Sequence, residues 1–420
     1  MPSREPELVN PVPVEEVGPW VRAMATTFLH DHRSPGVQGW IDQLLGRWNP
    51  ERAWGIRDGG RWVATLRTEP RRLTVPGPPG AMAEVEVDAV TNVTVAATHR
   101  RRGLMTRMLE SSLRAARERG DTLGALIPAE WPIYGRFGYA PATLSADYVL
   151  HRSQPGVCCE GSPGAIRQVE LAEAAEVAPA LFDQARRQWA GQMDRDAGWW
   201  QRNLGLEGTI PREPAAPNWF LHEGAQGVDG VLAWSPVGSP SLLAAQQQVD
   251  VQALFTTSLE AYRDLWAYLT SIDGIDQVSL ELRPVAEPVR WLLANPRALV
   301  ERRRVDFLWV RVLDVPAALR ARSYALAGEL VLEVSDPHSH GFATGRYRLN
   351  AGPDGAGCER VDADPDVWIE QRALASILLG GFRLAELEPA GMAQERRPGG
   401  LARADLMFST AGVPWNATWF

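Results

Sequence analysis

The spacing of apolar residues in the first third of the chain alternates between a helical period and a strand period. An apolar stripe at helical spacing predicts a helix over Glu15–His32. Asp58-Gly59 separates two short runs between Trp54 and Arg67, which predicts a β-hairpin. The pattern then predicts a loop, a long strand, an amphipathic helix and another strand: Pro76–Gly80, Val85–Val95, Leu104–Arg119 and Leu123–Ile127.

A second stretch repeats this order of elements. It comprises an amphipathic helix, a strand-turn-strand, a strand leading into a helix, and a last strand: Val169–Trp189, Asn218–Ser235, Val249–Leu269 and Val278–Leu282. The first stretch has three arginines and a glycine between strand and helix, whereas here the turn reads Leu254-Phe-Thr-Thr257. We therefore interpret the second stretch as a degenerate copy, kept for packing and for walling a substrate cleft.

The pattern changes again after Arg304. It predicts short strands and helices of an α+β unit with an antiparallel sheet: Phe307–Leu313, Pro316–Arg322, Gly328–Ser335, Gly345–Asn350, Val361–Glu370 and Arg372–Leu379. The chain ends in an aromatic segment, Trp415 to Phe420, although most chains end in a polar, frayed tail. This ending predicts a buried C-terminus.

Size and charge narrow the possibilities. The 420 residues, 45% of them hydrophobic, are too many for one core and predict two to four domains. A net charge of -8 argues against nucleic acid and fits, weakly, a cationic substrate. All 43 basic residues are arginine, which we read as a bias of the source genome.

Cysteine usage and the N-terminus suggest a cytoplasmic protein. The three cysteines, Cys158, Cys159 and Cys358, make neither a disulfide framework nor a Cys-x-x-Cys metal motif, and no metal is expected. The N-terminus lacks the apolar core of a signal peptide, and no apolar run reaches membrane-spanning length.

The turn Arg100-Arg-Arg-Gly103 lies between a strand and a helix, where backbone N–H groups and the helix dipole favour an anion. Three arginines before a helix can also be a solvated face. No Gly-Lys-Ser/Thr follows, which excludes a P-loop, and the single glycine excludes a Rossmann fingerprint. Arg100-x-x-Gly103-x-Met105 resembles the coenzyme A pyrophosphate loop of GNAT acetyltransferases, although Met105 replaces the usual small residue.

A second motif, Ile133-Tyr-Gly-Arg-Phe-Gly-Tyr139, follows the predicted strand after this helix. Its aromatic residues could simply fill a core. Acetyl transfer from a thioester expels a thiolate, however, and a phenol near the sulfur can protonate it. Combined with the arginine turn, the motif favours a catalytic tyrosine.

Together, THRRRGLMT, IYGRFGY, the degenerate second copy and the aromatic terminus resemble the Eis family of acetyl-CoA-dependent N-acetyltransferases, over essentially the whole chain. The resemblance implies α/β and α+β architecture with tandem GNAT-like domains, the second degenerate, and a C-terminal sterol-carrier-protein-like α+β domain. The implied ranges are 1–152, 153–302 and 303–420. It also implies a homohexamer that acetylates small-molecule amines, including aminoglycosides at more than one position.

The resemblance also assigns roles to individual residues. Tyr134 would be the general acid, and the terminal carboxylate of Phe420 would accept the amine proton. Glu84 and Glu86 are rival bases, because many GNAT enzymes use a glutamate on this strand. The acetyl-CoA site would comprise the pantetheine strand, the pyrophosphate loop and the acyl-side loop: Val93, Thr94, Val95, Arg101, Arg102, Gly103, Leu104, Met105, Thr106, Ala129 and Glu130.

Two alternatives remain open from the residues alone. The protein could be a non-catalytic acyl-CoA or lipid-binding module, or a GNAT enzyme that acetylates lysine or N-terminal amines of proteins.

His338-Ser-His340 could mark a metal site but is more often a polar loop. No local string encodes the acceptor, so its identity is not predicted.

Overall fold

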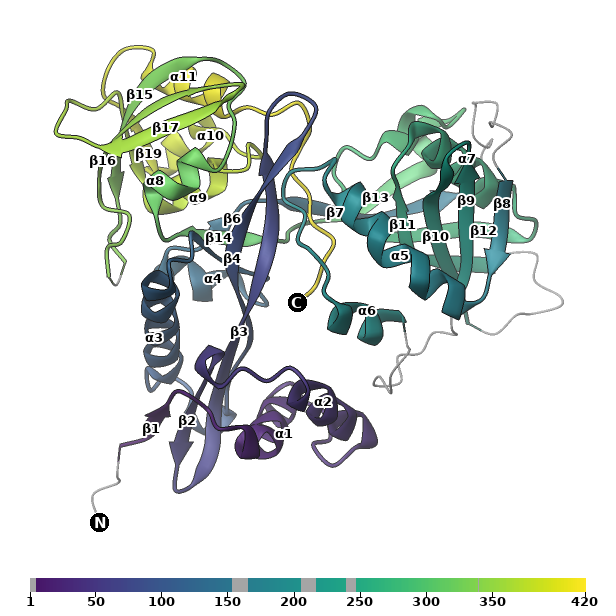
Figure 1. The fold of residues 1–420 in the computed structure, drawn as a ribbon, viewed down its shortest axis with the longest axis horizontal. Helices are drawn as coiled ribbons and strands as arrows, with labels where there is room; N and C mark the ends of the chain where they lie inside the picture. Colours follow the sequence, from purple (N-terminus) through teal and green to yellow (C-terminus); the bar gives the residue numbers. More distant parts are fainter. Residues whose placement is uncertain (1–4, 153–164, 205–216, 239–246, 339) are drawn as a thin grey trace.

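The computed structural model describes residues 5–152, 165–204, 217–238, 247–338 and 340–420. Cys158 and Cys159 lie outside these ranges, and Cys358 is a free, buried thiol. Within the described residues the strands form three sheets, of seven, seven and five strands. Figure 1 shows the three units around the C-terminal tail, which runs between the second unit and the other two.

The first sheet has the strand order β1-β2-β3-β4-β5-β14-β6. The hairpin predicted at Asp58-Gly59 is present, because Asp58 pairs with Arg61 across the turn. The strands, in that order, are Glu7–Val9, Ala53–Asp58, Arg61–Pro76, Met82–Val95, Leu123–Leu126, Trp309–Val312 and Ala140–Pro141. The helices are α1 (Val17–Thr27), α2 (Pro35–Leu45), α3 (Leu104–Arg119) and α4 (Trp131–Tyr134).

The helix predicted over Glu15–His32 is present as α1 but is shorter, and the helix that follows it was not predicted. Helix α1 ends at Thr27, Phe28 is 46% exposed, and Leu29 adopts a left-handed φ of 64°. A second helix, α2, starts at Pro35, where the side chain of Ser34 accepts a hydrogen bond from the backbone N–H of Val37. Serine before proline is a helix start, so the pattern contained the signal for two helices.

The second sheet has the order β13-β7-β12-β11-β10-β9-β8. Its strands are Leu299–Asp306, Leu144–His151, Ile275–Pro284, Gln247–Thr256, Gly227–Val237, Asn218–Gly224 and Ala165–Val169. Its helices are α5 (Leu171–Arg186), α6 (Ala197–Leu204) and α7 (Leu259–Ser271). The repeated order of helix, strand pair, strand, helix and strand is therefore present.

The sheets do not coincide with the three predicted ranges, because two strands lie in a neighbouring sheet. Strand β7, from the range 1–152, pairs with β12 and β13 of the second sheet. Strand β14, from the range 303–420, pairs with β5 and β6 of the first sheet. The predicted strand Phe307–Leu313 thus belongs to the first sheet, and each of the two strands completes the sheet of a neighbouring unit.

The third sheet has the order β17-β16-β15-β18-β19 and is mixed, so the predicted antiparallel sheet is wrong. Strands β15 and β18 are parallel, from Leu332↔Val367 to Ser335↔Glu370, because the chain after β17 crosses to the other side of β15. The strands are Gly355–Arg360, Gly345–Gly352, Gly328–Ser335, Val367–Glu370 and Ala393–Glu395. The helices are α8 (Val315–Arg320), α9 (Gln371–Ile377), α10 (Leu384–Leu387) and α11 (Gly400–Phe408).

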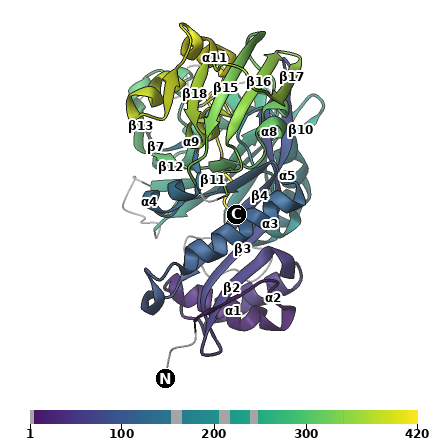
Figure 2. The ribbon, with the colours of Figure 1, turned by 90° about the vertical axis from the view of Figure 1, so that its left-hand side faces the viewer.

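After α11 the tail is extended, and alternate residues face opposite sides. Asn416 and Thr418 are fully buried, whereas Trp419 is 57% exposed. The predicted buried terminus therefore holds for one face of the tail only. In Figures 1 and 2 the C-terminus lies beside the middle of the long strands β3 and β4.

Candidate active site

The parallel strands β4 and β5 separate in the middle of the first sheet. Their pairing runs from Val87↔Leu123 to Val90↔Leu126, where β5 ends, while β4 continues to Val95. In the described ranges, no strand pairs with this edge of β4 beyond Val90. The edge at Val93–Val95 can therefore present backbone N–H and C=O groups to an extended guest.

A β-bulge shapes this edge. The register of β4 against β3 shifts between Thr65 and Arg67, and Asn92 has a φ of 55°. The hydroxyl of Thr65 donates to the carbonyl of Asn92 at 2.9 Å. Bulges re-aim backbone groups at functional sites, and here the bulge directly precedes the predicted pantetheine strand.

The turn after β4 ends at the uncapped start of α3. Arg101 and Gly103 have left-handed φ values of 61° and 73°, and no side chain caps the helix. The amides of Leu104, Met105 and Thr106 are first-turn donors without an intrahelical acceptor. Such donors at a helix start favour an anion, and a diphosphate is the predicted guest. The side chain of Met105 packs against the apolar cluster beneath the sheet, which accommodates its departure from the GNAT pattern.

The arginines of this turn are exposed. Arg102 approaches Asp58 at 3.9 Å, and His99 also contacts that carboxylate, at 3.0 Å. Neither Arg100 nor Arg101 has an ion pair with a described residue, so both guanidinium groups can face an anionic ligand.

Tyr134 lies at the end of α4 and is 8% exposed. It belongs to the same apolar cluster as Val90, Leu126 and Val93, at the point where β4 and β5 separate. Burial, and then the nearby carboxylate of Glu130, raise the pKa of Tyr134 to about 12. The phenol therefore keeps its proton at neutral pH and can donate it. Ala129 and Glu130, in the loop before α4, are both exposed.

The tail brings the last residue to the same place. The hydroxyl of Thr91, directly after the last β4–β5 pair, donates to the terminal oxygen of Phe420 at 3.0 Å. The indole N–H of Trp199 donates to the carbonyl of Trp419 at 2.8 Å, and Arg195 Nε donates to Thr418 Oγ1 at 3.1 Å. The terminal oxygen of Phe420 thus lies beside β4, one residue after the end of its pairing with β5.

Glu84 and Glu86, the rival bases, lie toward the other end of β4. Glu84 forms ion pairs with Arg186, with Arg187 at 3.6 Å and with Arg72 at 3.8 Å. It precedes Thr94 by ten residues, about 33 Å along an extended strand. Glu86 is exposed. Neither carboxylate is at the site.

Comparison with known proteins identifies the family. GNAT acetyltransferase domain models match residues 9–142 and 191–312, and a sterol carrier protein domain model matches residues 315–417. The chain is 31% identical over 349 residues to the N-acetyltransferase Eis of Mycobacterium tuberculosis, covering 81% of each protein. This chain belongs to the Eis family of GNAT N-acetyltransferases.

Other relatives extend over nearly the whole chain. An uncharacterized N-acetyltransferase of Streptomyces avermitilis is 38% identical, covering 97% of this chain and 97% of that protein. The crystal structure of Eis1 from Mycobacterium abscessus superposes with a TM-score of 0.84 and 29% identity, covering 99% and 100% of the two chains. This Eis-family chain is therefore an acetyltransferase that acts on amines, and its GNAT fold implies acetyl-CoA as cosubstrate. None of the helices in the described residues is long and apolar enough to cross a membrane.

The sequence analysis did not identify the residues that fix the turn Ile133–Tyr139, called here the Tyr134 turn, in this Eis-family protein. Arg311 of β14, fully buried, donates to the carbonyl of Phe137 and pairs with the buried Asp336 at 3.2 Å. Gly138 has a φ of 81°, and a Cβ there would lie 1.9 Å from the Arg311 guanidinium. An arginine inside the apolar run FLWVRVL was the available signal, since buried charge is retained with a partner.

The histidines of the candidate metal motif have polar contacts instead. His338 Nδ1 lies 2.9 Å from the carbonyl of Arg136 in the Tyr134 turn, and His340 Nε2 lies 3.1 Å from the carbonyl of Glu110. Although Glu370 is partly buried, hydrogen bonds from His338 and Arg372 lower its pKa to about 2. In the described part of the chain, no group of three or more histidine, cysteine or acidic side chains could hold a metal ion.

The second GNAT unit has a different strand separation. Strands β11 and β12 pair in parallel from Gln247↔Ile275 to Val251↔Leu280. Beyond that point Arg283 donates to the carbonyl of Leu254 at 2.9 Å, and the indole of Trp415 donates to the carbonyl of Leu282 at 2.6 Å. The side chain of Ser258 caps helix α7. This geometry agrees with the predicted loss of the coenzyme loop.

Proposed function

We propose that the protein acetylates primary amines of small polyamines, with aminoglycoside-like molecules as the substrate class, by direct attack in a ternary complex with acetyl-CoA. The observation that carries the proposal is that one strand separation collects three groups. These are the unpaired edge Val93–Val95, the protonated phenol of Tyr134, and the terminal oxygen of Phe420 bound to Thr91.

Each group would have one role. Backbone N–H groups of Val93–Val95 would polarise the thioester carbonyl. Tyr134 would donate its proton to the departing sulfur. The carboxylate of Phe420, oriented by Thr91, would accept the proton of the attacking amine directly or through water. Arg101 to Thr106 would hold the diphosphate, and Ala129 and Glu130 would border the acyl group.

Aromatic residues surround the tail end on the acceptor side. The ring of Trp419 packs edge-on against Phe307 at 5.1 Å, and Trp199 bonds the Trp419 carbonyl. Trp419 is 57% exposed, and an exposed aromatic face beside a carboxylate suits a cationic amine. This surface supports a small amine over a protein segment, but aminoglycosides themselves rest on the family resemblance. The homohexamer also rests on the family resemblance, whereas the cytoplasmic location rests on cysteine usage and the N-terminal sequence. Both stay predictions.

Thiol release from acetyl-CoA tests the function. Purified protein is assayed with a polyamine panel that includes aminoglycosides, and with lysine-containing peptides as the alternative acceptor. Release that requires both an amine and Tyr134 supports the proposal and ranks the acceptors. Release with peptides alone would favour the protein-acetylating alternative. A co-purifying lipid without any turnover would favour the non-catalytic module.

A further inference from the structure

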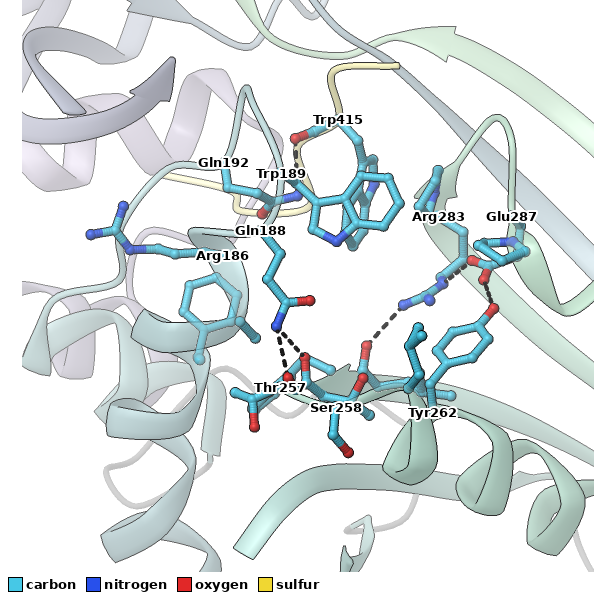
Figure 3. A pocket seen from close by; sticks show the side chains of 18 residues that line it. Arg186, Gln188, Trp189, Gln192, Thr257, Ser258, Tyr262, Arg283, Glu287 and Trp415 are labelled. Carbon is cyan, nitrogen blue, oxygen red and sulfur yellow. Dashed lines mark hydrogen bonds and ion pairs between the residues drawn. The ribbon is translucent and has the colours of Figure 1, made fainter. Parts of the chain in front are cut away.

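A cavity of about 190 Å³ lies in the second GNAT unit, apart from the catalytic strand separation. It is bounded by the end of α5, the β11–α7 turn, the end of β12 and the tail residue Trp415. Figure 3 shows Trp189 and Trp415 on one side, Thr257 and Ser258 on the opposite side, and Arg283 with Glu287 at one end.

The position of this cavity matches the place where the first unit would bind its coenzyme. Both lie at the carboxyl ends of a parallel strand pair, where α/β folds commonly bind ligands. In the second unit, the turn offers no phosphate site. Ser258 accepts from the Ala261 amide at 3.0 Å, and Asp229 accepts from the hydroxyl of Ser258 at 2.6 Å. A coenzyme or another phosphate ester is therefore a poor occupant.

The walls are mainly apolar and include five aromatic side chains. Trp189 and Trp415 pack edge to face at 5.8 Å, and Phe182 and Phe255 do so at 5.5 Å. Such rings prefer another ring in edge-to-face or offset contact. An apolar cavity of about 150 Å³ accommodates benzene, so this one has room for one ring or two small fused rings.

The charged groups of the cavity are already paired. Arg283 donates to Glu287 at 2.7 Å, and the hydroxyl of Tyr262 donates to the same carboxylate. Arg186 pairs with Glu84 and with Asp183. A charged ligand would face no surplus opposite charge, whereas an uncharged one disturbs no pair. Polar atoms remain at the rim, where Gln188 donates to the carbonyl of Thr257 at 3.2 Å.

We propose that this cavity is a binding site for an uncharged aromatic molecule of one or two fused rings carrying a single polar group. Its ring would lie between the two aromatic pairs, and its polar group would exchange hydrogen bonds with the Gln188 amide or the Thr257 carbonyl. The site is separate from acetyl transfer, since none of these side chains belongs to the proposed catalytic machinery.

Binding of indole and phenol to the full-length protein, measured by calorimetry and ligand-observed NMR, tests the proposal. Ala185 lines the cavity and is 6% exposed, so Ala185→Leu fills part of it, whereas Ala180→Leu adds the same atoms to the exposed face of α5. We expect saturable indole binding, weakened about tenfold or more by Ala185→Leu and unchanged by Ala180→Leu. Benzoate and benzylamine should bind more weakly than the neutral ligands.

Two results would overturn the site. The first is the absence of saturable indole binding to the unmodified protein, a measurement that does not depend on how the variant folds. The second is displacement of indole by acetyl-CoA, which would place the probe in the first unit. Basal acetyl transfer and circular dichroism of Ala185→Leu establish that the variant is folded. Failure of indole to bind would leave acetyl transfer untouched, so this proposal and the proposed function fail separately.

Discussion

The parallel pairs β4–β5 and β11–β12 occupy equivalent places in two GNAT units. The backbone groups at the end of the first pair are open to a ligand, whereas those of the second pair are occupied by side chains. The first pair leaves the edge of β4 open, and its turn leads into a helix without a side-chain cap. In the second pair, the side chains of Arg283 and Trp415 donate hydrogen bonds to backbone carbonyls beyond the last paired residues, and Ser258 caps helix α7. The fold alone therefore does not make a coenzyme site, and a few residues of the turn and strand ends decide it.

The difference follows from where backbone groups find partners. A helix start and a strand edge both carry N–H groups that require acceptors. In the second unit the protein supplies those acceptors and donors itself. In the first unit they are left for a ligand, and Gly103 at its left-handed φ keeps the turn free of side-chain atoms.

The largest effect expected is on the tail, which passes both regions. One glycine added after Phe420 moves the terminal carboxylate by about 3.5 Å from Thr91. Loss of a positioned proton acceptor should lower kcat by about 10³-fold. Acetyl-CoA affinity, measured by calorimetry, should stay unchanged, and one glycine added at the N-terminus is the control. Unchanged turnover would refute the carboxylate role.

Tyr134→Phe should lower kcat about 10²-fold, because the sulfur loses its proton donor. Tyr139→Phe is the matched control. Tyr139 lies in the same motif, packs edge-on against Tyr134 at 6.5 Å, and its hydroxyl has no hydrogen-bond partner among the described residues. Steady-state kinetics should separate the two variants, and equal losses would mean that the packing of the motif, not the acid, is responsible.

Gly103→Ala should raise KM for acetyl-CoA about tenfold, because an L-residue is strained at φ 73° and the turn must re-aim its amides. Gly120→Ala is the control at the other end of α3. Its φ is 85°, and an added Cβ meets nothing within 4 Å at either glycine. Thermal unfolding should show similar losses of stability, about 1 kcal/mol. A raised KM in both variants would point to the helix and not to the turn.

Ser258→Ala should expose the α7 amides, yet calorimetry should still find one acetyl-CoA per chain. Loss of the cap should reduce stability by about 1 kcal/mol. Ser271→Ala, at the exposed end of the same helix, should cost less. Binding of a second acetyl-CoA per chain, to the unmodified protein or to Ser258→Ala, would contradict the difference drawn between the two strand pairs.

The smallest effect concerns pH. The pKa of Tyr134 is raised to about 12, so its acid form persists through neutral and mildly alkaline solution. The kcat profile should therefore show no alkaline limb attributable to this phenol below about pH 10, two units under the raised value. A limb near the ordinary tyrosine pKa that disappears in Tyr134→Phe would show that the acid is not desolvated during turnover.

Local chemistry made much of this site predictable. The glycine that closes the arginine turn, the hairpin at Asp58-Gly59 and the motif around Tyr134 are encoded in consecutive residues. The helix predicted over Glu15–His32 ends earlier, at Thr27, before the left-handed residue Leu29. The next helix was missed because Ser34-Pro35 was not read as a helix start. The site-residue roles themselves stay predictions until the variants are measured.

Pairing between distant segments was not predictable from periodicity. An apolar run such as Phe307–Leu313 predicts a strand but not which sheet it joins, and it lies beside β5 instead of within the C-terminal unit. The same holds for the parallel pairing of β15 with β18. Arg311 and Asp336, which hold the Tyr134 turn, come from these distant segments.

The exchange of strands between units also constrains how the chain can fold during translation. Strand β5 ends at Leu126, but its partner β14 begins only at Trp309. Likewise, the partners of β7, strands β12 and β13, come much later in the chain than β7 itself. On the ribosome the first sheet therefore cannot close until the second unit has been made. Contacts so distant in sequence are slow to form, and nascent chains that stop before Trp309 should depend on chaperones.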